Sequence, residues 1–248
     1  MSQFYGPEAK PLITVVTVVR NGAAQLEETL RSVFAQGYSN LAYIIIDGGS
    51  TDGTLEIIRR YADRLTFWVS EPDRGIYDAM NKGWAVARDE GYLLFLGAGD
   101  RLLSLPKDME RFGHNEVVYG VVELGNRQFR PESGVGLRCN NTLHHQALLV
   151  PKSLHPEPPF DTRFRLYADF DFNQRLLKQG VHFVFSEELR GYALPGGASS
   201  SKAHRETLAI VAKNFGFCWS LWAFCYLVLR RMARFFRDGH AAGMGGAP

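Results

Sequence analysis

Acidic residues follow three predicted strands in the first half of the chain. Asp47 ends an apolar run, Asp73 follows the strand predicted over 66–70, and Asp100 follows the strand predicted over 92–96. Apolar runs of this kind are typical of buried parallel strands, whose carboxyl ends meet at one edge of the sheet. We therefore expect the carboxylates to converge on a crevice. There, one can accept a hydrogen bond from a nucleoside and another can hold a divalent cation on a diphosphate.

The glycine-rich segment 47–54 is compatible with this chemistry but does not establish it alone. Its glycines let the backbone approach a ligand closely, and Ser50, Thr51 or Asp52 can cap the helix that begins near Thr54. An ordinary strand-to-helix turn has the same residues, and each of the three acids could be a turn or cap residue. Convergence of acids that are distant in sequence is harder to explain locally, which favours a nucleotide site.

Alternating strands and helices position these acids. Predicted strands cover 12–19, 43–46, 66–70 and 92–96, and predicted helices cover 25–36, 54–62 and 77–87. This pattern predicts an α/β fold with a parallel sheet covered on both faces. From about Pro106 the segments become shorter and more β-like, such as 116–123, before a helix at 169–180 and a strand at 181–185. The chain is therefore expected to have a first half, 1–105, and a second half, 106–200.

Composition narrows the class of protein. With 248 residues, 46% hydrophobic and 22% charged, the chain has the composition of a globular protein. Its net charge of +2 is too small for nucleic-acid binding over the whole surface. Residues 1–11 lack the features of a secretory signal, which predicts a cytoplasmic location. Cys139, Cys218 and Cys225 are scattered, which favours buried thiols over a zinc site or a disulfide framework.

Longer motifs connect these segments to a known family. They are Thr14–Gly22, Ile46–Thr54, Ser70–Gly83 and Phe95–Asp100 in the first half, and His145–Gln146 and Tyr167–Asp171 in the second. On these residues, over about 12–200, the chain resembles glycosyltransferases of family 2, and most of all the branch that builds bacterial exopolysaccharides such as colanic acid. The resemblance implies the GT-A fold with a mixed sheet. A Rossmann-like half that binds the nucleotide sugar precedes an acceptor-binding half that carries the catalytic base.

The resemblance also implies a set of donor-binding residues. Asp47 and Asp73 would contact the base and ribose of a nucleotide-diphosphate sugar, with UDP favoured and GDP as the alternative. Asp78 and Asn81 would lie on the helix that borders the donor, although for Asn81 a polar helix face is an equal explanation. The full implied set is Thr17, Val19, Asp47, Asp73, Asp78, Asn81 and Gly99.

Asp100 occupies the last position of the family's metal-binding acidic motif. Gly97 and Gly99 stand where other members often carry Asp or Asn, so one carboxylate remains. A Mg²⁺ or Mn²⁺ ion would then be held by Asp100, the donor diphosphate and water. His145 is a further candidate contact for the metal or the phosphates, although a lone histidine beside an apolar strand is commonly structural. The segment 196–199 is interpreted as a loop that closes over the diphosphate, or as a plain linker.

Asp169 corresponds to the acid of the family's Glu-Asp motif, with Ala168 in place of the usual Glu. A single displacement at the anomeric carbon needs a base that takes the proton of the acceptor hydroxyl. The resemblance assigns that role to Asp169, with Asp171 as the alternative. Acids are also favoured in the first turn of any helix, because the backbone amides are exposed there.

The C-terminal segment combines aromatic and basic residues. The apolar residues 215–229 are too few for a membrane span, which needs about twenty, and a group of arginines follows them. We therefore predict amphipathic helices over 201–237 that contact a membrane surface through 215–237. Packing on the catalytic halves or on a second copy, and a re-entrant hairpin, are the alternatives. Residues 238–248 are predicted to be disordered.

Together these observations predict an inverting, metal-dependent glycosyltransferase, peripheral on the inner face of the cytoplasmic membrane. Its acceptor would be a lipid-linked or growing saccharide in bacterial surface polysaccharide synthesis. A catalytically weak nucleotide-sugar-binding subunit of a polysaccharide assembly complex is the alternative, because carboxylates are missing at Gly97 and Gly99. A nucleotidyltransferase is a weaker alternative, since no glycine- and basic-rich triphosphate loop occurs near the start of the chain.

Overall fold

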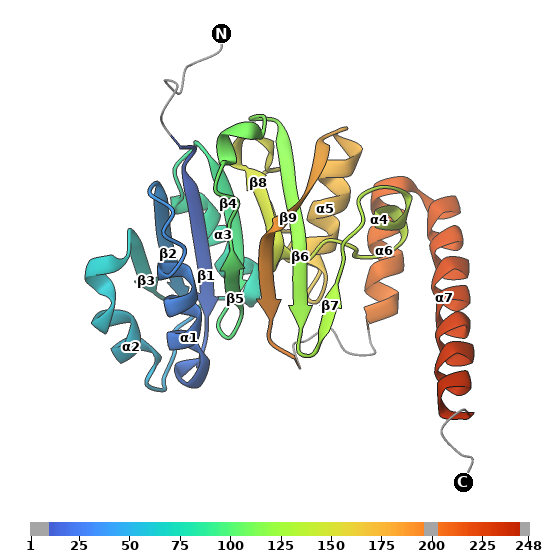
Figure 1. Cartoon of the computed structure of the whole chain (residues 1–248), viewed down its shortest axis with the longest axis horizontal. Coiled ribbons are helices and arrows are strands. Elements are labelled where there is room, and N and C mark those ends of the chain that lie inside the picture. Colours follow the sequence, from blue (N-terminus) through green and yellow to red (C-terminus); the bar gives the residue numbers. More distant parts are fainter. Residues whose placement is uncertain (1–9, 196–202, 244–248) are drawn as a thin grey trace.

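One mixed sheet organises the chain in the computed structural model, which describes residues 10–195 and 203–243, without the side chains of 203–204, 230–231 and 233–243. Within that part the nine strands lie in the order β3-β2-β1-β4-β8-β6-β9-β5, with β7 paired to β6 (Figure 1). They are β1 (Ile13–Val19), β2 (Leu41–Asp47), β3 (Phe67–Ser70), β4 (Tyr92–Gly97), β5 (Arg101–Ser104), β6 (Glu116–Leu124), β7 (Arg127–Phe129), β8 (Leu148–Pro151) and β9 (His182–Ala193).

The helices are α1 (Ala23–Phe34), α2 (Thr54–Arg60), α3 (Ile76–Val86), α4 (Val135–Cys139), α5 (Ala168–Lys178), α6 (Ala203–Phe215) and α7 (Phe217–Gly243). The segments that the sequence predicted as helices in the first half correspond to α1, α2 and α3. The loop predicted at 196–199 lies outside the described residues.

The first four strands along the sheet are parallel, as the sequence predicts. β1 pairs with both β2 and β4, and β2 also pairs with β3. The chain therefore runs outward from β1 through β2 to β3, and then returns to the other side of β1 at β4. Such a reversal opens a crevice at the carboxyl ends of the two strands that flank it, which here are β1 and β4.

Antiparallel pairs extend the sheet beyond β4, so the sheet is mixed, as the resemblance implies. β8 is antiparallel to both β4 and β6, whereas β9 is parallel to β6 and antiparallel to β5. The strand predicted at 181–185 is only the first part of β9, which continues to Ala193. The amide of Leu194, just after β9, donates to Asp100 after β4. The second half of the chain thus reaches the edge of the crevice.

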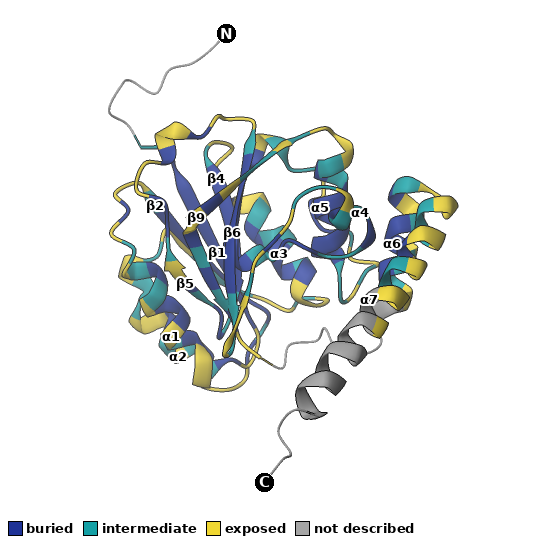
Figure 2. Ribbon diagram, turned by 45° about the vertical axis from the view of Figure 1, so that its right-hand side comes forward, coloured by how far each residue is buried: buried dark blue, intermediate teal, exposed yellow. Residues whose placement is uncertain are grey.

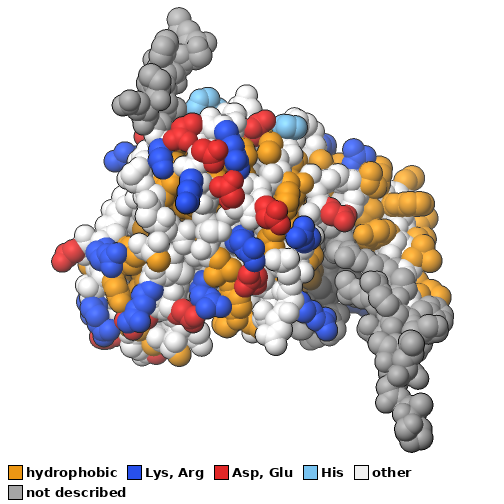
Figure 3. All heavy atoms as spheres, viewed as in Figure 1, with side chains coloured by type: hydrophobic (Ala, Val, Ile, Leu, Met, Phe, Trp, Pro, Cys, Tyr) orange, Lys and Arg blue, Asp and Glu red, His pale blue; other side chains and the backbone are white. Residues whose placement is uncertain are grey.

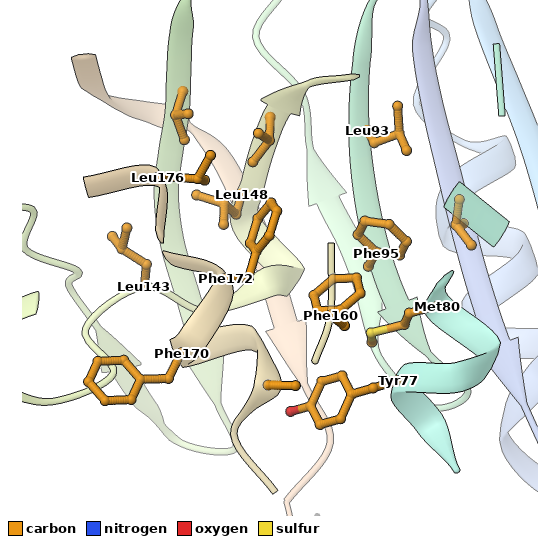
Figure 4. Packing of buried hydrophobic residues seen from close by; sticks show 14 of the residues in the cluster. Tyr77, Met80, Leu93, Phe95, Leu143, Leu148, Phe160, Phe170, Phe172 and Leu176 are labelled. Atoms are coloured by element: carbon orange, nitrogen blue, oxygen red, sulfur yellow. The ribbon is translucent and has the colours of Figure 1, made fainter. Parts of the chain in front are cut away.

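Helices cover both faces of the sheet, and each face has its own apolar cluster. α1 and α2 pack on one face and α3 and α5 on the other. On the second face Phe160 contacts the rings of Tyr77, Phe95 and Phe172, at centroid distances of 5.6, 5.1 and 5.3 Å (Figure 4). Because these rings come from α3, β4 and α5, the cluster fixes the two halves of the chain against each other.

The C-terminal helices lie at the end of the molecule opposite β3 and α2 (Figure 1). α6 packs on α4, α5 and α7, and α7 also packs on α4. In its described first part, α7 has buried or half-buried positions on one side and exposed ones on the other (Figure 2). The helix continues to Gly243, into the segment 238–248 that the sequence predicts to be disordered. Cys139 is buried as expected, but Cys218 and Cys225 are exposed because they lie on the outer side of α7.

Gly120 lies in β6 at an irregularity in the β6–β9 pairing, between Tyr119 and Val121. A Cβ atom added there would overlap the backbone carbonyl of Leu189, so β6 and β9 would have to separate. We expect Gly120→Ala to lower the free energy of unfolding by about 3 kcal/mol or more, measured by urea denaturation. Gly180→Ala is the control: with φ of 74° and open space around it, it should cost about 1 kcal/mol. Equal losses in the two variants would contradict the prediction.

Candidate functional site

A cavity of about 230 Å³ opens at the carboxyl ends of β1 and β4. Its walls come from these strand ends, from the segment after β3 and from the start of α3. The lining residues include Val19, Arg20, Asp73, Ile76, Gly97 and Ala98. The cavity therefore lies at the point where the strand order reverses, and two of the predicted donor-binding residues, Val19 and Asp73, line it.

Local contacts hold Asp73 at this cavity. Its carboxylate accepts a hydrogen bond from the amide of Gly75 at 3.0 Å and lies 4.0 Å from the guanidinium of Arg20. A Cβ atom at Gly48 would overlap this carboxylate, so glycine in the loop after β2 permits the approach. A carboxylate has about four acceptor positions. Asp73 can therefore accept further hydrogen bonds, for example from a ribose hydroxyl or a base N–H.

Asp47 does not line the cavity, in contrast to the role that the resemblance implies. Its side chain is fully buried. The carboxylate accepts the hydroxyls of Ser50 and Ser70 at 2.5 and 2.6 Å, and the amides of Gly49 and Ser50 at 3.1 and 2.9 Å. Because Ser70 ends β3 and Ser50 follows β2, Asp47 fixes the loops beneath the cavity instead of facing a ligand.

Asp78 and Asn81 lie on α3 but face a second cavity, of about 510 Å³, between α3 and the segment 158–163. The side-chain amide of Asn81 donates to the carbonyl of Phe160 at 2.8 Å and accepts its amide at 3.0 Å. Asp78 accepts the amide of Arg74 at 3.0 Å. For Asn81 the structure favours the helix-face explanation, since both ends of its side chain bond to protein.

Thr17 and Gly99 also have structural contacts and do not line the first cavity. The hydroxyl of Thr17 is buried and lies 3.0 Å from that of Tyr43. Gly99 has φ of 97°, and a Cβ atom there would lie 2.6 Å from Cδ2 of Leu194. Glycine at this position therefore lets the end of β9 approach the turn after β4.

Asp100, His145 and Asp169 meet beside the first cavity, although they are far apart in sequence. The ring of His145 lies between the two acids, with Nε2 3.7 Å from Oδ2 of Asp100 and Nδ1 3.5 Å from Oδ2 of Asp169. Asp100 closely follows Gly97 and Ala98, which line the cavity, and Asp169 lies in the first turn of α5. The fold thus places one acid from each half on either side of a single histidine.

Groups from four separate segments of the chain hold Asp100. Its carboxylate accepts the amides of Gly97 and Leu194 at 2.9 and 3.0 Å, and the side-chain amide of Gln146 at 3.0 Å. The hydroxyl of Thr29 on α1 donates to the backbone carbonyl of Asp100 at 2.7 Å. This cradle fixes the direction of the single carboxylate that remains of the acidic motif.

The residues present fit a divalent cation only in the company of a diphosphate. Within residues 10–195 and 203–243, no group of three His, Cys, Asp or Glu side chains could hold a metal ion. Asp100 offers one hard oxygen ligand, and magnesium commonly takes one or two carboxylates together with phosphate oxygens and water. The donor itself would therefore have to supply much of the coordination.

Asp169 accepts hydrogen bonds on both carboxylate oxygens. The hydroxyl of Tyr77 and the amide of Phe170 donate to Oδ1, at 3.1 and 2.9 Å. The side-chain amide of Asn141 donates to Oδ2 at 3.0 Å. These contacts orient the carboxylate toward His145, while about a tenth of the side chain remains exposed.

Asp171, the alternative base, has a different environment. Its carboxylate is fully buried and forms ion pairs with Arg175 and Lys213, at 3.0 and 2.8 Å. The side-chain amide of Asn214 donates to it at 2.9 Å. Asp171 therefore joins α5 to α6, and of the two acids Asp169 is the one that faces the cluster.

The charges of the cluster keep its three groups ionised at neutral pH. Burial alone would raise the pKa of Asp100 and of Asp169, but His145 and the hydrogen bonds that each carboxylate accepts together outweigh burial and hold both pKa values below the usual range. Burial would lower the pKa of His145, whereas the two carboxylates raise it to about 9. Asp169 is therefore a carboxylate at neutral pH and is able to accept a proton.

Tyr77, Asn141 and Gln146 position the acids of the cluster, and the sequence analysis gave none of them a role. Tyr77 and Gln146 lie in motifs that resemble the family, next to Asp78 and His145, and that proximity was a usable signal. Asn141 lies in a segment without any motif, so its contact with Asp169 depends on the fold alone.

The chain is similar to known glycosyltransferases. The sequence model of the family described as "Glycosyl transferase family 2" matches residues 14–146. The PGL/p-HBAD biosynthesis glycosyltransferase of Mycobacterium bovis (strain BCG / Pasteur 1173P2) is 32% identical over 219 residues, which cover 81% of this chain and 84% of that relative.

Solved structures share the fold. S. aureus TarS 1-349 in complex with UDP aligns with a TM-score of 0.65 at 16% identity, over 90% of this chain and 72% of TarS 1-349. Mannosyltransferase PcManGT from Pyrobaculum calidifontis, in complex with GDP-Man and Mn²⁺, aligns with a TM-score of 0.62 at 17% identity, over 96% of this chain and 82% of PcManGT. At these identities the similarity concerns the fold.

The pKa of His145 predicts how stability depends on pH. Folding raises this pKa from 6.5 to about 9, and a group with a raised pKa stabilises fully below the unfolded value and loses its contribution as pH rises through the folded value. The free energy of unfolding, measured by urea denaturation, should fall by on the order of 3 kcal/mol between these pH values. His145→Gln should remove this fall, whereas His182→Gln, on an exposed histidine paired with Glu116, should retain it. The same pH dependence in His145→Gln and wild type would contradict the prediction.

Proposed function

The chain belongs to glycosyl transferase family 2, and we propose that it transfers a sugar, with inversion, from a nucleotide-diphosphate donor to a saccharide hydroxyl. The observation that carries this proposal is the meeting of Asp100, His145 and Asp169 beside the cavity. In this proposal Asp100 is available to the diphosphate of the donor, and Asp169 is available to the acceptor. The first half of the chain would thus hold the leaving group, and the second half would supply the base.

The donor site in this proposal is the cavity lined by Val19, Arg20 and Asp73. Asp73 would accept hydrogen bonds from the nucleoside. Arg20, whose side chain is mostly exposed, is free to approach a phosphate. Asp47 contributes indirectly, by fixing the loops that support the cavity. TarS binds UDP and PcManGT binds GDP-Man in similar folds, which supports a nucleotide sugar as donor; UDP remains the favoured nucleotide.

Asp169 is the base in this proposal. The acceptor oxygen attacks the anomeric carbon, the bond between that carbon and the diphosphate oxygen breaks, and the hydroxyl proton passes to Asp169. The low pKa of Asp169 keeps it deprotonated and ready at neutral pH. Tyr77 and Asn141 hold the carboxylate in one direction. A single displacement of this kind inverts the configuration at the anomeric carbon.

Asp100 would hold a magnesium or manganese ion together with the diphosphate. When bound, the ion supplies charge neutralisation for the leaving group. Gln146 and Leu194 keep the Asp100 carboxylate oriented. Nε2 of His145 lies 3.7 Å from the Asp100 carboxylate. Because the raised pKa of His145 makes it a cation at neutral pH, it would contact the phosphates and not the ion. The Mn²⁺ in the PcManGT complex supports a divalent cation in this fold.

The acceptor in this proposal is a lipid-linked or growing saccharide of a bacterial surface glycan, reached from the cytoplasmic side of the membrane. The relative named for PGL/p-HBAD biosynthesis supports a role in glycan assembly. The second candidate function is a nucleotide-sugar-binding subunit with little turnover, favoured by the single carboxylate at Asp100. If the chain binds the donor but forms no glycosylated product with any acceptor, that result would support the second function.

Nucleotide binding tests the donor site. Calorimetry with UDP, GDP, CDP and dTDP, each with and without Mn²⁺, should show that one nucleotide binds and that its affinity rises with the ion. Asp73→Ala should weaken this binding at least about tenfold, because it removes a buried hydrogen-bond acceptor. Asp78→Asn is the matched control and should change the affinity less than about twofold. Equal losses in both variants would place the donor elsewhere.

Turnover tests the base. In Asp169→Asn the amide cannot take a proton, so we expect kcat for release of nucleotide diphosphate, with acceptor present, to fall about 10²- to 10⁴-fold. Binding of the nucleotide should stay within about twofold of wild type, because Asp169 lies on the acceptor side. A kcat within about tenfold of wild type would remove Asp169 from the role of base.

A further inference from the structure

One side of α7 exposes an apolar surface to solvent. Phe217 is 79% exposed and Trp222 is 60% exposed, which is unusual for large apolar side chains on a well-packed helix. The apolar arc, as we name this surface, consists of Phe217, Cys218, Leu221, Trp222, Phe224, Cys225, Val228, Leu229 and Met232. Hydrophobic side chains gather over α7 at the right-hand end of the molecule in Figure 3. No charged residue occurs in 214–229, so nothing polar interrupts the surface.

Helical periodicity separates this surface from the side of α7 that packs on the protein. Successive residues are about 100° apart around a helix, which places the whole apolar arc within about 160°. The remaining side carries Trp219, Ser220, Ala223, Tyr226 and Leu227, which are buried or half-buried. Trp219 and Phe215 contact the guanidinium of Arg138 on α4, at 5.0 and 5.5 Å from the ring centroids. α7 therefore packs on the protein through one side, while the apolar arc on its other side faces solvent.

Beyond Leu229 the sequence of α7 becomes basic. Residues 230, 231, 234 and 237 are all Arg, and residues 235 and 236 are both Phe. The helix that exposes the apolar arc is thus followed, within the same element, by a segment with four arginines.

We propose that the apolar arc of α7 binds the surface of a bilayer that contains anionic phospholipids. A helix that combines an aromatic and apolar side with basic residues lies in the interface, with its apolar side at the acyl boundary. Aromatic rings favour that depth, and arginines attract anionic headgroups. The protein packs on the side of α7 that carries Trp219 and Ala223, away from the apolar arc, and would face water. Contact with a second copy would cover the apolar arc but would leave the arginines unexplained.

No helix in the described part of the chain is long and apolar enough to cross a membrane.

This attachment would place the acceptor side of the site near lipid, a step that rests on the proposed function. Arg138 contacts the start of α7, and Asn141, three residues later, donates to Asp169. The segment 135–141 therefore links the bilayer-binding helix to the base. An acceptor carried by a lipid would approach Asp169 from that side, while the donor enters at the ends of β1 and β4.

Vesicle binding by the full chain tests the attachment without any donor or acceptor. A polarity-sensitive thiol dye can be placed on Cys218 and Cys225, which are exposed, while Cys139 is buried. Vesicles of phosphatidylcholine with phosphatidylglycerol should shift the dye emission to the blue and sediment the protein. Vesicles of phosphatidylcholine alone should bind at least about tenfold more weakly, and added salt should weaken the anionic binding by screening.

Two variants distinguish vesicle binding through the apolar arc from nonspecific hydrophobic binding. Trp222→Glu should weaken vesicle binding at least about tenfold, because it places a charge on the side that enters the bilayer. Val86→Glu, at a 46% exposed apolar residue on α3, is the matched control and should bind as wild type does.

Equal loss in both variants, or no binding to anionic vesicles, would overturn the proposal. A dye shift that depends on protein concentration and not on vesicles would instead identify a second copy as the occupant. Because no nucleotide is used, a negative result leaves the transferase assignment intact.

Discussion

Two buried carboxylates, Asp100 and Asp169, share one positive charge on His145. Without that charge the burial of each acid, which raises its pKa, would meet less opposition. With it, the pKa of each acid stays low and that of the histidine rises. The shared charge also joins the halves of the chain, since Asp100 follows β4, His145 precedes β8 and Asp169 begins α5.

The order of the strands makes this sharing geometrically available. β8 is antiparallel to β4, so the segment just before β8 lies beside the segment just after β4, and His145 meets Asp100. The end of β9 comes back to the same turn, where the amide of Leu194 bonds to Asp100. Gly99 permits that approach. The single acid that remains of the motif is therefore held rigidly, because the second half of the chain supplies its support.

The acids of the first half divide into two physical classes. Asp73 is at the cavity and retains free acceptor positions, whereas Asp47 is saturated by four hydrogen bonds. A similar division occurs in the second half, where Asp169 faces the cluster and Asp171 is neutralised by Arg175 and Lys213. In both pairs one acid is a support and the other is available to a ligand. In this chain acidic side chains therefore serve the structure as well as the proposed chemistry.

The sequence by itself determined the elements of the first half and the family, because apolar periodicity and contiguous motifs are local features. It also placed an acid at the end of β2, after β3 and after β4. It could not tell Asp47 from Asp73, since the hydroxyl that helps saturate Asp47 comes from Ser70 on the neighbouring strand. Nor could it show that Asn81 turns toward Phe160, because the helical repeat fixes angles within α3 but not which side meets the donor cavity. Those outcomes, and the meeting of His145 with two acids, depend on strand order and on contacts between residues far apart in the chain. Tertiary packing decides them, and no local pattern encodes them.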